Sequence, residues 1–212
     1  MKALIIGATG ATGKDLVNLL LQNPDYTEVV AFVRRPSKLV HPKLLEIVTD
    51  FEKLEEHADT IKGDVWFSCL GTTLKAAGSK EKQWHIDHDI PAKFAEIAKR
   101  NGVSKAVLVS AYGASTTSKV FYSRLKGTLD EHIIKLNFDQ CIIFRPGFLI
   151  RKDTDRLMER ITAHGLKLLN SLGLIRKFRP LPTATLAQKL AQAPRILSPG
   201  KHIIELDEIF GV

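Results

Sequence analysis

The feature that most constrains the fold of this chain is a glycine-rich loop near the N-terminus, Gly7-Ala-Thr-Gly10-Ala-Thr-Gly13. It directly follows an apolar run over residues 2–6 and precedes a stretch over residues 14–23 that carries apolar side chains at helical spacing. Strand, loop and helix in this order form the context that a dinucleotide-binding motif requires. Glycine lets the backbone approach a pyrophosphate, and the free N–H groups at the start of a helix attract that anion. We therefore assign the loop residues Gly7, Thr9, Gly10, Ala11, Thr12 and Gly13 to cofactor binding; the alternative is a glycine-rich turn without a ligand.

Apolar runs alternate with amphipathic stretches along most of the chain. The pattern predicts further strands over residues 29–33, 45–49, 65–70, 106–110 and 140–144, and helices over residues 89–101 and 122–135. Strands that are apolar on both faces and separated by helices indicate a parallel sheet covered on both sides. The predicted fold is α/β, a Rossmann-type doubly wound parallel sheet with helices on both faces and a small C-terminal cap.

The chain has 212 residues, and no linker rich in Gly, Ser or Pro divides it. We therefore expect a single domain over residues 1–212, with residues 151–212 forming the cap on the substrate side. In that segment the pattern favours helices over residues 155–172 and 183–193 and a last strand over residues 201–206. No apolar run is long enough to span a membrane, and two cysteines cannot form a disulfide framework, so we expect a cytoplasmic protein.

The ends of the next three predicted strands carry residues that would select the cofactor. Arg34 and Arg35 follow the second strand, where a guanidinium suits the 2′-phosphate of NADP(H) and a carboxylate would favour NAD. A solvated basic turn is the alternative for this pair. Asp50 and Phe51 follow the third strand, where an adenine ring would lie. The fourth strand is followed by residues that would let the chain pass close to the cofactor, Leu70, Gly71 and Thr72.

The candidate catalytic residues lie around the fifth strand and the helix after it. Tyr122 and Lys126 are four residues apart on a predicted helix, so they share one face of it. An adjacent ammonium stabilises a phenolate and makes tyrosine a usable acid or base near neutral pH. Ser110 ends the preceding strand at the carboxyl edge of the sheet, where ligands bind in open α/β sheets. Its hydroxyl would hold a substrate carbonyl while Tyr122 delivers a proton.

Several of these segments together resemble the short-chain dehydrogenase/reductase superfamily. They are the glycine loop, Ser110-Ala-Tyr-Gly-Ala, Tyr122-Ser-Arg-Leu-Lys126 and Phe144-Arg-Pro-Gly147. Cys69-Leu-Gly-Thr-Thr73 and Asp50-Phe-Glu-Lys-Leu54 narrow the resemblance to the atypical, NAD(P)-binding, NmrA-like branch that includes the Tat-interacting oxidoreductase-like proteins. The resemblance covers residues 1–150, and beyond them only the order of the elements agrees.

The resemblance implies a Rossmann-type fold that binds NADP(H), with Ser110, Tyr122 and Lys126 as the catalytic set. It also implies that Lys126 holds the nicotinamide ribose and that Pro146 lies beside the nicotinamide. The sequence departs from the family in one place: residues 84–89 contain no asparagine, which in many members completes a proton relay. Members of this branch are also linked to regulatory or binding roles.

Basic residues outnumber acidic ones, 31 to 23, and residues 161–204 contain no Asp or Glu at all. This segment is either a solvated basic face or a surface for an anionic substrate, an acidic protein partner or nucleic acid. Phe178 is its only aromatic residue, which argues against nucleic acid because single-strand binding uses aromatic stacking. The cluster over residues 85–89, with His85 and His88, lacks the further ligands that zinc needs, so we expect no metal.

These observations favour an NADPH-dependent oxidoreductase that reduces a small carbonyl compound. Tyr122 would protonate the oxygen, Lys126 would tune Tyr122 and bind the ribose, and Ser110 would orient the carbonyl. The alternative is an NADPH-binding regulatory or interaction protein with weak or no turnover. The sequence leaves both a monomer and a homodimer open.

Overall fold

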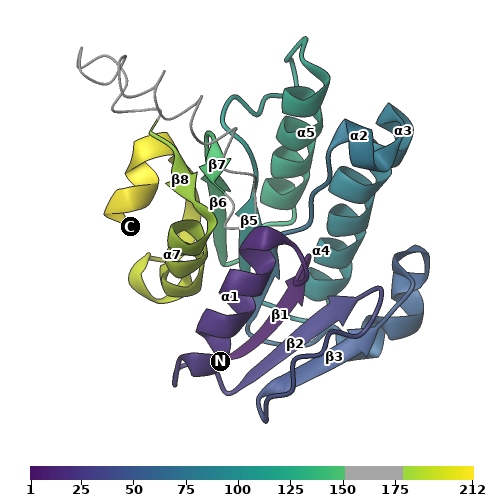
Figure 1. Cartoon of the computed structure of the whole chain (residues 1–212), viewed down its shortest axis with the longest axis vertical. Coiled ribbons are helices and arrows are strands. Elements are labelled where there is room, and N and C mark those ends of the chain that lie inside the picture. Colours follow the sequence, from purple (N-terminus) through teal and green to yellow (C-terminus); the bar gives the residue numbers. More distant parts are fainter. Residues whose placement is uncertain (151–178) are drawn as a thin grey trace.

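The computed structural model describes residues 1–150 and 179–212 of the chain. In this part of the chain, seven strands form one parallel sheet in the order β3-β2-β1-β4-β5-β6-β9 (Figure 1). Their bounds are β1 (Lys2–Ile6), β2 (Glu28–Val33), β3 (Leu44–Val48), β4 (Val65–Ser68), β5 (Lys105–Val109), β6 (Gln140–Arg145) and β9 (Gly200–Glu205). The strand order reverses between β1 and β4, which confirms the doubly wound Rossmann-type sheet.

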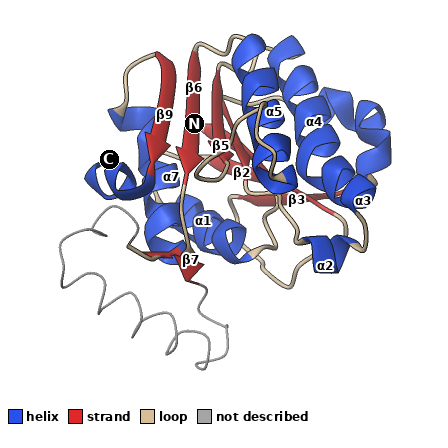
Figure 2. Cartoon of the chain, turned by 90° about the horizontal axis from the view of Figure 1, so that it is seen from above, coloured by secondary structure: helices blue, strands red, loops and turns tan. Residues whose placement is uncertain are grey.

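Helices cover both faces of the sheet (Figure 2). On one face α1 (Ala11–Gln22) packs against α7 (Thr183–Ile196), over inward side chains of β1 and β2 such as Ile5 and Ala31. On the other face lie α4 (Ile90–Arg100) and α5 (Phe121–Lys135), which enclose Trp66, Phe94 and Phe138. Burial of these large apolar side chains holds the helices against the sheet, and because all its strands are parallel their carboxyl ends lie at one edge.

One predicted helix begins earlier than the sequence pattern indicated. The helix expected from Asp89 is preceded by α3 (Lys80–Trp84) and a π-helical turn, η2 (His85–Asp89), which run directly into α4. Its true start is capped by Ser79, whose hydroxyl accepts a hydrogen bond from the Lys82 N–H. Pro91, which suggested a first turn, lies inside the helix just after the wide π-turn, because such a turn tolerates a residue without an N–H.

The C-terminal helix also differs from its prediction. Thr183 is the first residue of α7 rather than its cap, and its hydroxyl instead donates a hydrogen bond to Asp15 of α1 at 3.0 Å. The helix continues through the buried Pro194 to Ile196, because a proline in the last turn removes a single backbone hydrogen bond.

The segment expected to form a cap is divided in the structure. Residues 151–178, with the helix expected over 155–172, lie outside the described residues. The short strand β7 (Leu149–Ile150) precedes them and pairs in parallel with β8 (Leu181–Pro182), which follows them; α7, β9 and a last 3-10 helix, η4 (Leu206–Gly211), come next. Helix α7 completes a helical layer and β9 extends the main sheet beside β6. The cap and the single-domain division stay predictions.

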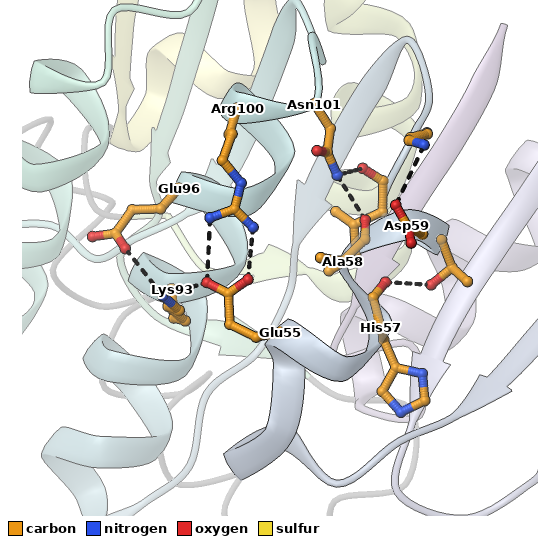
Figure 3. A network of polar contacts seen from close by, with 11 residues as sticks. Glu55, His57, Ala58, Asp59, Lys93, Glu96, Arg100 and Asn101 are labelled. Atoms are coloured by element: carbon orange, nitrogen blue, oxygen red, sulfur yellow. Dashed lines mark hydrogen bonds and ion pairs between the residues drawn. The ribbon is translucent and has the colours of Figure 1, made fainter.

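A polar network fastens the segment after β3 to α4 (Figure 3). This segment, the 3-10 helix η1 (Phe51–Thr60), carries Glu55, which pairs with both Arg100 and Lys93 of α4. These two cations lower the pKa of the Glu55 carboxyl to about 2, chiefly through hydrogen bonds. At the far end of η1, Asn101 donates hydrogen bonds to the Ala58 and Ile61 carbonyls. The network therefore holds η1, which begins with Phe51, against the body of the molecule.

Two short helices complete the arrangement at the carboxyl edge of the sheet. Helix α2 (Leu74–Ala77) follows β4 and is capped by Thr73, whose hydroxyl accepts from the Ala76 N–H. It leads through Gly78 into α3, and in Figure 1 both short helices lie near the top, beside α5.

Candidate functional site

The three glycines of the N-terminal loop have different structural roles. Gly7 has a φ of +77°, and a Cβ on it would lie 2.4 Å from the Cys69 carbonyl carbon. A Cβ on Gly13 would lie 2.1 Å from the Gly7 carbonyl oxygen, so this glycine lets α1 pack onto the loop. A Cβ on Gly10 would meet only the Gly7 oxygen, at 3.3 Å. Packing within the protein therefore requires glycine at 7 and 13, whereas Gly10 faces space that a ligand can use.

The loop fits the pyrophosphate of a dinucleotide cofactor. Gly10 is the N-cap residue of α1 and no side chain caps this helix start, so its first N–H groups are available to an anion. Ala11 and Thr12 are the first residues of the helix and Thr9 precedes the cap. All the loop residues assigned from the sequence therefore lie together at the carboxyl end of β1.

A cavity of about 520 Å³ lies where the sequence placed an adenine ring. One wall consists of Arg34, Asp50 and Phe51, and the opposite wall comes from α2, α3, η2 and the first residue of α4. His85 Nε2 lies 2.6 Å from Glu52 Oε1, which joins the two walls. The second wall was missed in the sequence, because nothing in the pattern shows that the chain after β4 turns back over the adenine position; its residues are Ala76, Ala77, Glu81, Lys82, His85, Ile86 and Ile90.

A second cavity of about 520 Å³ separates the glycine loop from the end of β2. It is lined by Thr9, Arg34, Arg35 and Pro36. The structure thus brings both predicted arginines next to the phosphate loop. Two guanidinium groups and a hydroxyl form a donor set that suits a phosphate group.

Tyr122 and Lys126 lie on one face of α5, as their spacing predicted. The Lys126 ammonium nitrogen is 5.9 Å from the centre of the Tyr122 ring. Lys126 is 3% exposed, whereas Tyr122 is 40% exposed and available to a substrate. In the described part of the chain, no hydrogen bond or ion pair engages the Lys126 ammonium. This buried cation is therefore free to bind hydroxyl groups of a ligand.

Ser110 lies just after β5 at the same edge but makes a contact that the sequence did not predict. Its hydroxyl donates a hydrogen bond of 2.9 Å to Asp130, which lies one turn beyond Lys126 on α5. Asp130 also accepts from Arg145 Nε at 2.9 Å, and Arg145 in turn pairs with Glu205 of β9. In this conformation the Ser110 hydroxyl donates its proton to the hydrogen bond with Asp130. Ser110 can therefore accept a hydrogen bond from a substrate but cannot donate one to it.

Two buried carboxyl groups near Lys126 were missed in the sequence. Burial raises the pKa of the Asp130 carboxyl, and the hydrogen bond from Ser110 and the charge of Arg145 oppose that rise. Burial likewise raises the pKa of the Asp87 carboxyl, opposed first by the charge of Lys126. The spacing of Asp130 from Lys126, four residues on one helix face, was a signal that could have found it.

The remaining predicted residues lie around the same edge. Leu70, Gly71 and Thr72 follow β4, and the Thr72 backbone is held on both sides by α3 and η2: its N–H donates to Asp87 at 2.7 Å and its carbonyl accepts from Gln83 at 3.0 Å.

Pro146 follows β6, and its carbonyl accepts from the Tyr112 N–H, which joins the ends of β5 and β6. Burial raises the pKa of the Cys69 thiol to about 12, so this cysteine is no reactive thiolate.

The basic C-terminal segment is described only in part. Of its described cations, Arg195 pairs with Asp25, Lys189 donates to the Phe210 carbonyl, and the Arg179 guanidinium stacks on the Phe210 ring. These three side chains therefore make internal contacts. No helix among the described residues is both long and apolar enough to cross a bilayer.

Comparison with known proteins identifies a cofactor-binding family. The sequence model of a family described as NAD(P)H-binding matches residues 7–167. The chain is 38% identical over 154 residues to "Protein FMP52, mitochondrial" of Kluyveromyces lactis, covering 71% of this chain and 68% of the relative. It is 37% identical over 150 residues to "Protein HTATIP2" of Rattus norvegicus, covering 69% of this chain and 62% of the relative.

Solved structures with the same fold belong to short-chain dehydrogenase/reductase proteins. A short chain dehydrogenase family protein from Francisella tularensis superposes with a TM-score of 0.67 at 17% identity, covering 96% of both chains. A superfamily protein from Agrobacterium tumefaciens with bound NAD gives a TM-score of 0.73 at 14% identity, covering 97% of this chain and 77% of that one. At these identities the likeness concerns the fold alone.

The names of the fungal relatives contradict the expected cytoplasmic location. Relatives from Kluyveromyces lactis, Candida albicans and Saccharomyces cerevisiae are all named mitochondrial. The cytoplasmic expectation was wrong because two cysteines indicate only a reducing environment, and that does not identify the compartment.

Proposed function

The chain belongs to the NAD(P)H-binding family within the atypical, NmrA-like short-chain dehydrogenases/reductases, and from this membership we propose that it is an NADP(H)-dependent oxidoreductase that reduces a small carbonyl compound. The observation that carries the proposal is the placement of Tyr122 and Lys126. A half-exposed phenol and a buried ammonium share the edge of the sheet at which the glycine loop and its cavities lie. That edge is where open α/β sheets bind their ligands.

The residues on this edge divide the chemistry between them. A bound nicotinamide supplies the hydride. The exposed Tyr122 hydroxyl donates a proton to the substrate oxygen, and the Lys126 charge stabilises the phenolate that remains. Lys126 also binds the ribose hydroxyls, because its ammonium has no hydrogen bond among the described residues. Ser110 contributes an acceptor to the substrate side while its proton stays with Asp130.

The preference for NADP(H) is part of the proposal. It is supported by the cavity between the glycine loop and β2, which Arg34, Arg35 and Thr9 line. No carboxylate lines this cavity among the described residues, whereas a carboxylate would repel a 2′-phosphate and bind a free ribose hydroxyl.

A second function has one observation in its favour. Because the Ser110 hydroxyl donates to Asp130, the catalytic set is not arranged to donate a hydrogen bond from Ser110 to a substrate carbonyl. A protein that binds NADPH for regulation would need the cofactor site but not this donor. The two functions share fold and cofactor and differ only in turnover.

The experiment is a panel of aldehydes, ketones and quinones assayed by NADPH absorbance. We expect at least one substrate, and we expect Tyr122→Phe to lower kcat by about 100-fold or more with little change in NADPH affinity. Tight NADPH binding with no turnover above background would favour the regulatory function instead. Turnover that persists in Tyr122→Phe would support the reductase function but show that Tyr122 is not the proton donor.

A further inference from the structure

Asp87 is a carboxyl group buried inside the protein, on the π-helical turn η2 that leads into α4. Its side chain is fully buried, and one of its carboxyl oxygens, Oδ2, has no hydrogen-bond partner in the described part of the chain. The other oxygen, Oδ1, accepts a short hydrogen bond of 2.7 Å from the Thr72 N–H. Burying a carboxyl group with a free oxygen costs free energy, so a compensating charge or ligand is expected beside it.

That charge is Lys126. A methyl group on Gly71 would lie 3.9 Å from Asp87 Oδ2 and 4.0 Å from the Lys126 ammonium nitrogen, so the two groups flank one small space beside Gly71. Gly71 leaves this space open because it has no side chain. The positive charge of Lys126 lowers the pKa of Asp87 against the larger effect of burial.

Among residues 1–150 and 179–212, no other cation takes this place. The elements packed against η2 are α3, α4 and α5. Asp130 on α5 is also acidic and bonds to Ser110 and Arg145. The other charged side chains nearby pair elsewhere, His85 with Glu52, His88 with Asp89, Lys93 with Glu55 and His132 with Glu96.

We propose that Asp87 is the positioning residue of Lys126: the charge of its carboxyl group, acting across the small space beside Gly71 and without a direct ion pair, holds the buried ammonium at the point where the cofactor would lie. The Thr72 hydrogen bond orients the carboxyl group, and the carboxyl group orients the lysine. The π-turn over His85–Asp89 supplies the geometry, because it carries Asp87 on the buried side of the helix. The inference rests on the proposed function in one respect, the contact between Lys126 and the cofactor.

Substitutions at Asp87 can separate the loss of its negative charge from the loss of its hydrogen bond with the Thr72 N–H. In Asp87→Asn the side-chain oxygen can still accept from the Thr72 N–H, but the negative charge is gone. In Asp87→Ala both are lost. Asp89→Asn is the matched control, because Asp89 lies on the same turn but its carboxylate is exposed and pairs with His85 and His88.

The first measurement needs no cofactor. The Asp87 carboxyl carbon is followed by ¹³C NMR against pH in the wild-type protein and in Lys126→Met, with Lys126→Gln as the alternative if Met does not fold; Asp87→Asn assigns the signal. We expect the titration of Asp87 to move up by about one pH unit or more when Lys126 loses its charge. An unchanged midpoint would show that the two groups do not interact and would overturn the proposal.

The second measurement is NADPH affinity by fluorescence titration, with thermal unfolding as a check on folding. We expect Asp87→Asn to weaken binding by about tenfold, Asp87→Ala to weaken it at least as much, and Asp89→Asn to leave it unchanged. Equal affinity in Asp87→Asn and wild type would leave Asp87 a neighbour of Lys126 without a positioning role. If the wild-type protein binds neither NADPH nor NADH, the proposed function fails, and the NMR result still decides whether Asp87 and Lys126 are coupled.

Discussion

The Ser110 hydroxyl donates a 2.9 Å hydrogen bond to Asp130, and both groups are almost fully buried at the carboxyl end of β5. This contact ties the residue that follows β5 to α5, the helix that carries Tyr122 and Lys126. Because Asp130 also binds Arg145, one carboxylate connects β5, α5 and β6. The stability of this edge of the sheet therefore depends on Asp130 more than on Ser110.

We expect Asp130→Ala to lower the free energy of unfolding by about 2 kcal/mol or more, because the buried Ser110 hydroxyl loses its acceptor and the Arg145 guanidinium keeps only Glu205. Ser110→Ala should cost only about 1 kcal/mol, since Asp130 keeps its contact with Arg145. Urea unfolding of the two variants, followed by circular dichroism, gives both values. A larger loss in Ser110→Ala than in Asp130→Ala would refute this ranking.

The glycine loop offers a second test, because its glycines differ in what surrounds them. Gly7→Ala places a side chain at positive φ and 2.4 Å from the backbone of Cys69 and Leu70, just after β4, so we expect a large loss of thermal stability. Gly10→Ala meets only one oxygen at 3.3 Å, so the free protein should keep its stability to within about 1 kcal/mol. NADPH affinity of Gly10→Ala should nevertheless fall by about tenfold or more, because the added methyl group occupies the approach of the pyrophosphate.

Normal NADPH affinity in Gly10→Ala would mean that the loop is only a turn. Calorimetry on the free variants and fluorescence titration with NADPH separate the two effects. Gly13→Ala serves as a second control, since its Cβ would lie 2.1 Å from the Gly7 oxygen and should act on folding.

The strands and the phosphate loop could be predicted because their signals are local. A run such as residues 2–6, apolar from Ala3 to Ile6 and ended by Gly7, has few alternatives to a buried parallel strand. The true start of this helical stretch, at α3, could not be predicted. Asp89 and Pro91 resemble the start of a helix, and the π-turn that accommodates them gives no signal in the spacing of apolar residues.

The polar interior of the site was harder to predict than its outline. The partner of Ser110 lies twenty residues away on another element, and the partner of the Thr72 N–H lies fifteen residues away. Such contacts depend on how α5 and η2 pack over the sheet, which the order of residues in the chain does not show. Asp87 in particular stood in a stretch with His85 and His88, which drew attention only to a possible metal cluster and to the missing asparagine.

Cofactor preference tests the arginines at the end of β2. Arg34→Asp places a carboxylate in the cavity next to the glycine loop, where it would repel a 2′-phosphate and accept a hydrogen bond from a free ribose hydroxyl. We expect the ratio of NADPH to NADH affinity to fall by at least tenfold, through weaker NADPH binding. Both dissociation constants are measured by fluorescence at one ionic strength, with Arg100→Asp as the control because Arg100 lies on α4 and pairs with Glu55. Equal dissociation constants for NADPH and NADH in the wild-type protein would contradict the proposed preference for NADP(H).

The pH dependence of stability tests the burial of Asp87. Burial raises the pKa of this carboxyl in the folded state above its value in the unfolded chain, so the group contributes stability at low pH that is lost as pH rises through the folded-state pKa. Asp87→Asn and Asp87→Ala both lack the titrating group, so each should gain stability relative to wild type as pH rises from about 4 toward neutrality. The two variants should differ from each other by a constant amount, because only Asn still accepts from the Thr72 N–H. Urea unfolding at a series of pH values measures these differences, and a difference from wild type that stays flat or falls over this range would show that the carboxyl is not held in a desolvated environment.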